Sequence, residues 1–271
     1  MSQAPRNFLL RHPDFGLFWA GMFAVNIAVQ IEAVTIGWQI YSIGRETMSI
    51  KESAFLVGMV GLAQFLPLFA LTLWAGSLAD RHSRRAIVLV SLLVETLCVL
   101  GLVAVALEDA PQLTHIFAIA AMFGAARAFL SPASSALVPM LVPKSDMPQA
   151  ISLKSLSWQA AVIVGPWLGG LLCAVSTAAA YATTAVLYAA GMAILLLMRA
   201  NTTPERQPGS QWAQIKEGLA YTWHNKIIFG AISLVLFAVL LGGATALLPA
   251  FASDILKVGP GGGTALNADL S

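Results

Sequence analysis

Hydrophobic residues occur along the chain in long runs that no charged side chain interrupts. These runs cover residues 15–31, 53–79, 110–126, 155–198 and 227–253. A helix needs about 20 consecutive apolar residues to cross the hydrocarbon core of a bilayer. Because the run 155–198 is 44 residues long, it has room for two crossings, with a turn near 175–180. Strands of a membrane barrel would alternate over about ten residues, so these continuous runs predict helices.

We expect an all-α integral membrane protein, because backbone groups in lipid must bond within their own segment. Seven spans are predicted, at 15–41, 54–78, 86–107, 114–138, 151–173, 179–198 and 227–251. The first six form one unit, 15–198, and the segment 199–226 links that unit to the seventh span. An N-terminal stretch, 1–14, and a polar tail, 252–271, complete the chain.

The composition excludes most water-soluble folds. Hydrophobic residues make up 58% of the chain and charged residues only 10%, whereas a soluble domain carries about 25% charge. Polar side chains are too few to cover a soluble surface, so a lipid bilayer is the expected partner. The net charge of +2 is too small to indicate the clustered basic side chains that bind nucleic acid. Cys98 and Cys173 lie in apolar runs and are expected to be packing residues.

Lysine and arginine gather at alternate ends of the predicted spans. Eleven of the fifteen flank one set of ends, three flank the other, and Arg127 lies within a span. Because positively charged flanks stay in the cytoplasm, we expect residues 1–14 to be cytoplasmic. The linker 199–226 lies on the same side. One apolar stripe in the linker is typical either of a helix on the membrane surface or of a helix packed on protein: Trp212, Ile215, Leu219 and Trp223.

The connection between the second and third spans, residues 76–85, reads GSLADRHSRR. The preference for positive charge on the cytoplasmic side explains the arginines of this segment. It does not explain Asp80 beside them, or Gly76 one turn earlier. A glycine at this place lets a neighbouring helix approach closely. The segment resembles the signature loop of the major facilitator superfamily, with Ser83 where the family often has Gly. In that family the loop latches two six-helix halves together. The resemblance implies the latch residues Gly76, Asp80, Arg81, Arg84 and Arg85.

A stripe of small residues runs along the fifth span at four-residue spacing: Ser157, Ala161, Gly165, Gly169 and Cys173. Such a stripe permits close helix packing, which is common in membranes, and Pro166 permits a bend. The core formed by Gly165, Pro166, Gly169 and Gly170 resembles the fifth-helix motif of proton antiporters in the same superfamily, which favours export over import. We expect the helices that pack on this stripe to belong to the superfamily's second half.

Three charged residues lie inside predicted spans: Glu32, Glu95 and Arg127. Each costs about 2.5–3.5 kcal/mol at mid-helix on insertion scales, so each should face a partner or a cavity. Glu95 and Arg127 reach the middle of antiparallel spans. Either they form a structural ion pair, or a carboxylate takes and releases protons with Arg127 setting its proton affinity. Glu32, Glu95 and Arg127 are therefore the candidates for proton coupling.

Polar amides mark the first two spans. Asn26, Gln30 and Gln64 are expected either to line a substrate cavity or to form interhelical hydrogen bonds. The stretches 36–41, 62–67 and 131–133 resemble a bacterial subgroup of drug and siderophore exporters that includes the enterobactin exporter. This resemblance implies a multi-pass protein of the bacterial inner membrane.

No constellation of catalytic residues occurs in the sequence, so we do not expect an enzyme. The four histidines are scattered without metal-ligand spacing, and no P-loop is present to bind ATP. We therefore expect no metal or cofactor, and an ion gradient, that of protons, as the energy source. The hypothesis is a proton-coupled exporter of small amphipathic molecules that works by alternating access.

The resemblance to the superfamily covers about residues 7–258. Full members have twelve spans in two halves, so we expect this chain to be C-terminally truncated, with one half and the first span of the second. Two chains could then self-associate to supply both halves. The alternative is a non-transporting membrane fragment or assembly partner.

Overall fold

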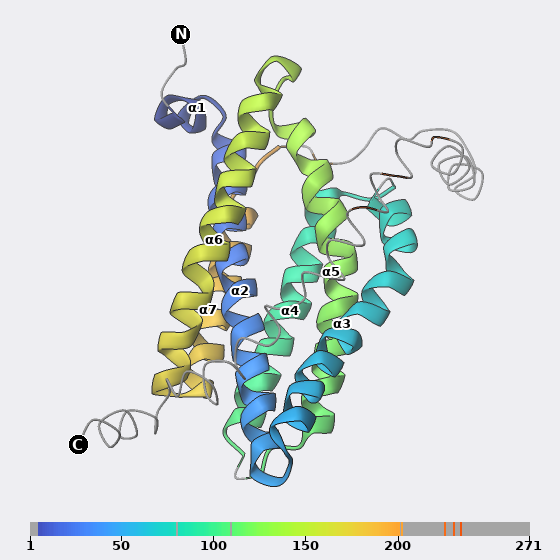
Figure 1. Ribbon diagram of the computed structural model, residues 1–271. Coiled ribbons are helices and arrows are strands. Elements are labelled where there is room, and N and C mark those ends of the chain that lie inside the picture. Colours follow the sequence, from blue (N-terminus) through green and yellow to red (C-terminus); the bar gives the residue numbers. More distant parts are fainter. Residues whose placement is uncertain are drawn as a thin grey trace. The chain divides into compact units, whose positions relative to one another are not determined.

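The structure, a computed structural model, describes residues 5–79, 81–108 and 110–200 together with residues 202, 225, 230 and 234 (Figure 1). Contacts divide the chain into two compact units, Met1–Pro204 and Glu205–Ser271. The predicted seventh span, most of the linker with its apolar stripe, and the polar tail lie outside the described residues.

Six helices are long and apolar enough to cross a membrane, which confirms the first six predicted spans and the all-α class. They are α2 (Pro13–Thr47), α3 (Ile50–Ala79), α4 (Arg84–Ala106), α5 (Leu113–Leu141), α6 (Met147–Val175) and α7 (Thr177–Leu196). Two short elements accompany them, α1 (Pro5–Arg11) before α2 and the 3-10 turn η1 (Lys144–Asp146) before α6. The described part of the chain contains no strand.

Local sequence explains several helix ends. Pro13 begins α2, where a missing backbone N–H costs nothing. Ser83 caps α4 by accepting a bond from the backbone N–H of Ala86. Ser176 ends α6 and caps α7, accepting from the backbone N–H of Ala179 at 3.0 Å. This cap lies at the predicted turn near 175–180, which the structure confirms.

The helices pack in a pattern that repeats within the unit. The most extensive contacts pair α2 with α6 and α7, α5 with α3 and α4, and α4 with α7. Exchanging α2, α3 and α4 with α5, α6 and α7 leaves this set of contacts unchanged. The bundle is therefore built from two three-helix repeats in which α2 and α5 are equivalent.

Large apolar side chains fill the core of this bundle and also lie on parts of its surface. Phe15, Phe18 and Phe123 are fully buried between helices. Phe69 on α3 and Trp167 on α6 are more than 60% exposed. Exposed aromatic groups on long apolar helices are expected where lipid, rather than water, surrounds the protein.

The N-terminal helix α1 is attached to the same end of the bundle as η1. The guanidinium of Arg11 and the ring of His12 both contact the carboxylate of Asp146, at 2.5 and 2.8 Å. The carboxylate of Asp14 accepts from the backbone N–H of Arg199 at 2.8 Å. These contacts hold the start of α2 against the connections that precede α6 and follow α7.

Candidate functional site

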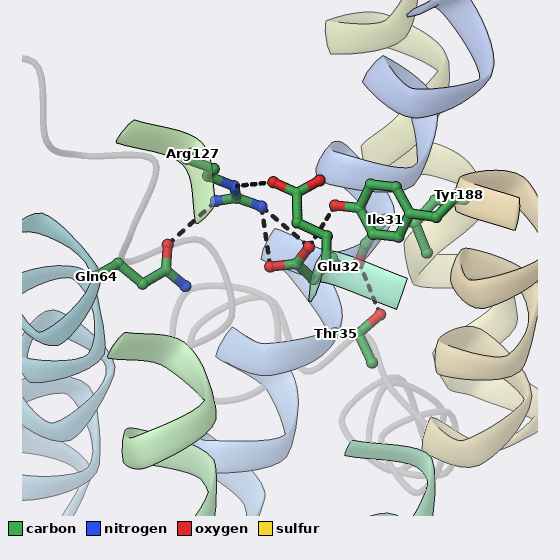
Figure 2. A network of polar contacts seen from close by, with 7 residues as sticks. Ile31, Glu32, Thr35, Gln64, Arg127 and Tyr188 are labelled. Carbon is green, nitrogen blue, oxygen red and sulfur yellow. Dashed lines mark hydrogen bonds and ion pairs between the residues drawn. The ribbon is translucent and has the colours of Figure 1, made fainter. Parts of the chain in front are cut away.

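Five helices each bring a polar side chain to the middle of the bundle, and Figure 2 labels Glu32, Gln64, Arg127 and Tyr188 among them. Glu32 comes from α2, Gln64 from α3, Glu95 from α4, Arg127 from α5 and Tyr188 from α7. Each lies near the midpoint of its helix, far from either end. The cluster therefore joins helices of both three-helix repeats at the depth where charge is most costly.

Glu32 is held by a full set of hydrogen-bond donors. Nη2 of Arg127 donates to both of its carboxylate oxygens, at 2.9 and 3.0 Å. The hydroxyl of Tyr188 donates to Oε2 at 2.7 Å. Nη1 of Arg127 donates to Oε1 of Gln64 on α3 at 3.2 Å. Charge-assisted bonds of this kind are the strongest in proteins, so Glu32 and Arg127 form a tightly held pair.

Glu95 lies on the other side of the guanidinium without any such donor. Its Oε1 is 3.8 Å from Nε of Arg127. Among the described residues, neither carboxylate oxygen of Glu95 has a hydrogen-bond partner, and neither does Nε of Arg127. The side chains of Glu32 and Glu95 are fully buried, while that of Arg127 is 20% exposed. The second carboxylate is thus close to the cation but unsatisfied.

The charges of this cluster do not balance when every group is ionised. One guanidinium and two carboxylates carry a net charge of −1. An uncompensated charge inside a protein costs several kcal/mol, and the bilayer around this bundle increases that cost. Binding of one proton makes the cluster neutral. The arrangement can therefore hold one exchangeable proton, with the ring of Phe123 supporting the guanidinium at 5.5 Å.

The structure brings all three predicted in-membrane charges together. The sequence suggested a pair of Glu95 with Arg127, but it gave no sign that Glu32 is the hydrogen-bonded partner. Tyr188 was missed altogether. The sequence feature that could have identified Tyr188 is a tyrosine in the middle of an apolar span. A buried tyrosine hydroxyl usually requires a polar partner.

The other predicted amides contact neighbouring helices. Gln64 bonds to Arg127, as described above. Nδ2 of Asn26 donates to the hydroxyl of Ser157 on α6 at 3.4 Å. Gln30 also faces α6, where its Cβ would lie 2.3 Å from a Cβ added to Gly165. These contacts account for interhelical bonding and packing, and lining of a substrate cavity stays a prediction.

The small-residue stripe packs on α2 of the same unit, so the expectation that its partner belongs to a second half was wrong. A Cβ added to Gly169 would lie 3.2 Å from Cβ of Val34, and Gly165 meets Gln30 as above. Gly170 has no neighbour within 4 Å of an added Cβ among the described residues. Pro166 lies within α6, whose helical structure continues past it. Gly165 and Gly169 thus permit the close contact of α6 with α2.

The predicted latch loop is anchored to two other helices. Nη1 of Arg84 donates to the carbonyl of Ala136 on α5 at 2.8 Å. Arg85 donates to the carbonyls of Leu195 and Leu196 at the end of α7, at 3.1 and 2.7 Å. The loop belongs to the first three-helix repeat, whereas α5 and α7 belong to the second, so these bonds join the two repeats.

The structure describes only some of the other predicted latch residues. Asp80 lies outside the described residues, and the side chain of Arg81 is exposed. An added Cβ on Gly76 would meet nothing within 4 Å in the described part of the chain. The expected close approach of a helix at Gly76 is therefore absent there. A role of this loop as a conformational latch stays a prediction.

No group of three or more histidine, cysteine, aspartate or glutamate side chains is placed to hold a metal ion within the described ranges. The cluster in the middle of the bundle consists of two carboxylates, one guanidinium, one phenol and one amide.

Comparison with known proteins identifies a transporter family. The sequence profile described as transmembrane secretion effector, a branch of the major facilitator superfamily, matches residues 5–266. The staphyloferrin A transporter of Staphylococcus aureus is 23% identical over 75% of this chain and 50% of its own length. The enterobactin exporter EntS of Salmonella typhimurium is 27% identical over 62% and 39%, and the multidrug efflux pump Tap of Mycobacterium bovis is 26% identical over 86% and 58%.

The fold is shared with a solved transporter. A crystal structure of a POT family transporter, in complex with a thioalcohol conjugated peptide, superimposes with a TM-score of 0.55 at 18% identity. That match covers 84% of this chain and 46% of the other chain. The chain thus spans about half the length of the curated relatives that it matches. The matched family and relatives are membrane transporters, not enzymes.

Proposed function

We propose, because the chain belongs to the transmembrane secretion effector family of the major facilitator superfamily, that it acts as a proton-coupled exporter of small amphipathic molecules. Relatives that are named as an enterobactin exporter and a multidrug efflux pump support export. The single observation that supports proton coupling is the buried cluster in which two carboxylates share one guanidinium.

In this proposal, protonation changes the charge at the centre of the bundle. The cluster is neutral with one proton and carries −1 without it, and Arg127 is bonded to groups on α2 and α3. A change of charge at this point alters the forces between the two three-helix repeats. Such a local electrostatic change can bias a transition between two packed states, which alternating access requires.

The placement in the membrane is part of the same proposal. The distribution of lysine and arginine supports a cytoplasmic N-terminus in a bacterial inner membrane. The loop held by Arg84 and Arg85 would then lie at the cytoplasmic end and act as the latch. Alternating access in this superfamily uses two six-helix halves. For the case in which the 271-residue chain acts without a second half, the proposal includes self-association of two chains.

Proteoliposomes with an imposed pH gradient test this proposal. The purified chain is reconstituted, and the movement of three fluorescent probes is followed: ethidium as an amphipathic cation, calcein as an anion and Nile red as a neutral molecule. We expect gradient-dependent flux of at least one probe, and its loss in Arg127→Ala. Glu108→Gln removes an exposed carboxylate outside the cluster and should retain flux. Flux that does not respond to the gradient, or that survives in Arg127→Ala, would contradict proton coupling through this cluster.

A further inference from the structure

We infer that Glu95 is the group that binds and releases the proton, whereas Glu32 stays ionised as the fixed counter-ion of Arg127. This inference rests on the proposed function and divides the roles of two carboxylates that the sequence could not distinguish. Its basis is the unequal hydrogen bonding around them.

The two carboxylates differ in the number of hydrogen bonds that they accept, although both are equally buried. Both side chains are fully buried. Glu32 accepts two bonds from Arg127 and one from Tyr188, which stabilise its charged form and leave little room for a proton. Glu95 accepts none from the described residues. A charged carboxylate without donors pays its full desolvation cost, so the proton that neutralises the cluster resides on Glu95.

The surroundings of Glu95 contain few other titratable groups. The helices packed on α4 are α5 and α7. α5 contributes Arg127, and α7 contributes Tyr188, whose hydroxyl is committed to Glu32. Glu32 itself lies beyond the guanidinium on α2, and Cys98 is one turn away on α4. None of these groups donates a hydrogen bond to Glu95 in the described structure, so no side chain described there stabilises its charged form as Tyr188 stabilises that of Glu32.

Release of the proton has a defined consequence for Arg127. The proton leaves an oxygen of Glu95 for water, and Glu95 becomes a carboxylate while Arg127 stays a cation. The unpartnered Nε of Arg127, now 3.8 Å away, can then donate to Glu95. Closing that gap to an ordinary charge-assisted bond requires a shift of about 1 Å. The guanidinium is the partly exposed member of the cluster, so we expect water to reach Glu95 past Arg127.

This shift connects the proton to the packing of helices. Arg127 also bonds to Gln64 on α3 and to Glu32 on α2. Movement of the guanidinium toward α4 therefore changes contacts with both of these helices. Bistable contacts of this kind turn a small displacement into a change between packed states.

Infrared difference spectroscopy of the purified chain tests the inference without requiring transport. Spectra at acidic and alkaline pH, recorded in H₂O and D₂O, detect the C=O stretch of a buried protonated carboxyl group. We expect one such band in the unmodified chain that disappears on deprotonation. Glu95→Asp and Glu32→Asp both keep the charge balance of the cluster, so a proton stays bound in each. The frequency of the band should shift in Glu95→Asp and stay unchanged in Glu32→Asp. Glu108→Gln serves as the control and should leave it unchanged.

A second variant keeps the test decisive if Glu32→Asp does not fold. Tyr188→Phe removes one donor from Glu32 and none from Glu95, so the Glu95 band should persist. A band that shifts in Glu32→Asp and not in Glu95→Asp would overturn the inference, as would its absence from the unmodified chain. If the band belongs to Glu95 but liposomes show no gradient-driven flux, then the proposed function fails and the assignment of the proton site stands.

Discussion

Tyr188 illustrates how single atoms define this site. Its hydroxyl donates to an ionised carboxylate at 2.7 Å, and Tyr181, two turns earlier on the same helix, donates to the neutral amide of Gln39 at the same distance. Both hydroxyls are buried in one apolar helix. The two tyrosines therefore allow a matched comparison between a bond to a charge and a bond to a neutral group.

We expect Tyr188→Phe to destabilise the chain by about 1.5–3 kcal/mol, the typical contribution of a hydrogen bond to a charged group. Tyr181→Phe should cost about 0.5–1.5 kcal/mol, as for a neutral pair. Thermal unfolding in detergent, followed by circular dichroism, measures the difference. An equal or larger loss in Tyr181→Phe would show that Glu32 does not depend on the Tyr188 bond.

Gly124 lies on α5 at a point where α3 approaches closely. A Cβ added there would lie 1.9 Å from the backbone carbonyl oxygen of Gln64, and backbone cannot yield as a flexible side chain can. We expect Gly124→Ala to cost about 1–3 kcal/mol through overpacking, and to displace Gln64 from Arg127.

Gly61 on α3 provides the control, because an added Cβ there meets nothing within 4 Å in the described structure. Gly61→Ala should be neutral, or stabilising by up to about 1 kcal/mol through helix propensity. The same unfolding measurement applies to both variants. If both substitutions are equally tolerated, α3 and α5 are farther apart than described.

At the scale of elements, the hydropathy pattern predicted the membrane spans and the turn at Ser176, because these depend on the local sequence. Each span follows from a run of apolar residues, and the turn at Ser176 follows from the length of the run 155–198. Which helices touch could not be predicted in this way. The apolar faces of these helices suit lipid as well as protein, so the contact of α6 with α2 at Gly165 was assigned to the wrong partner.

The same limit applies to the site. A charge inside a span signals that it needs a partner, which identified Glu32, Glu95 and Arg127 together. The choice of Glu32 as the bonded partner depends on the angle at which α2, α4 and α5 meet. No periodicity in the sequence encodes that angle, and Tyr188 carries no charge that would mark it.

The end of α7 provides a prediction at this scale. Arg85 donates to the carbonyls of Leu195 and Leu196 in the last turn of α7, where carbonyls lack the i+4 partner that they have inside a helix. We expect Arg85→Gln to raise hydrogen exchange in this turn roughly tenfold, as the loss of a charge-assisted cap permits local opening. Mass spectrometry of the peptide that contains the turn measures the rate.

Arg81→Gln is the matched control, because it removes a positive charge from the same loop and its side chain is exposed. Exchange at the end of α7 should stay unchanged in this variant. If Arg81→Gln accelerates exchange as much as Arg85→Gln, then the total charge of the loop, rather than the cap, holds the helix end.

At the scale of the whole molecule, the two three-helix repeats place Glu32 and Arg127 on equivalent helices, α2 and α5. The ion pair therefore lies where the two repeats meet and joins them. The six helices also fix alternate loops to opposite sides of the membrane. The loop at His82 and the start of α5 at His115 should face opposite compartments.

Cysteine labelling tests this topology. Cys98 and Cys173 are first replaced by serine or alanine, and His82→Cys and His115→Cys, both exposed sites, are then introduced one at a time. In intact cells an impermeant maleimide should label only the residue at position 115. Labelling at position 82 should require permeabilised cells. The reverse pattern would place the N-terminus outside and contradict the proposed orientation.

The most direct test of the central claim measures the proton itself. Liposomes that contain the purified chain and a pH-sensitive dye in the lumen receive a transported probe on one side, with no pH gradient imposed. We predict that the probe moving down its gradient drives protons in the opposite direction, so that the pH of the lumen changes in the unmodified chain and not in Glu95→Gln. Equal probe movement with no change of pH in the unmodified chain would contradict a proton-coupled exporter built around this cluster.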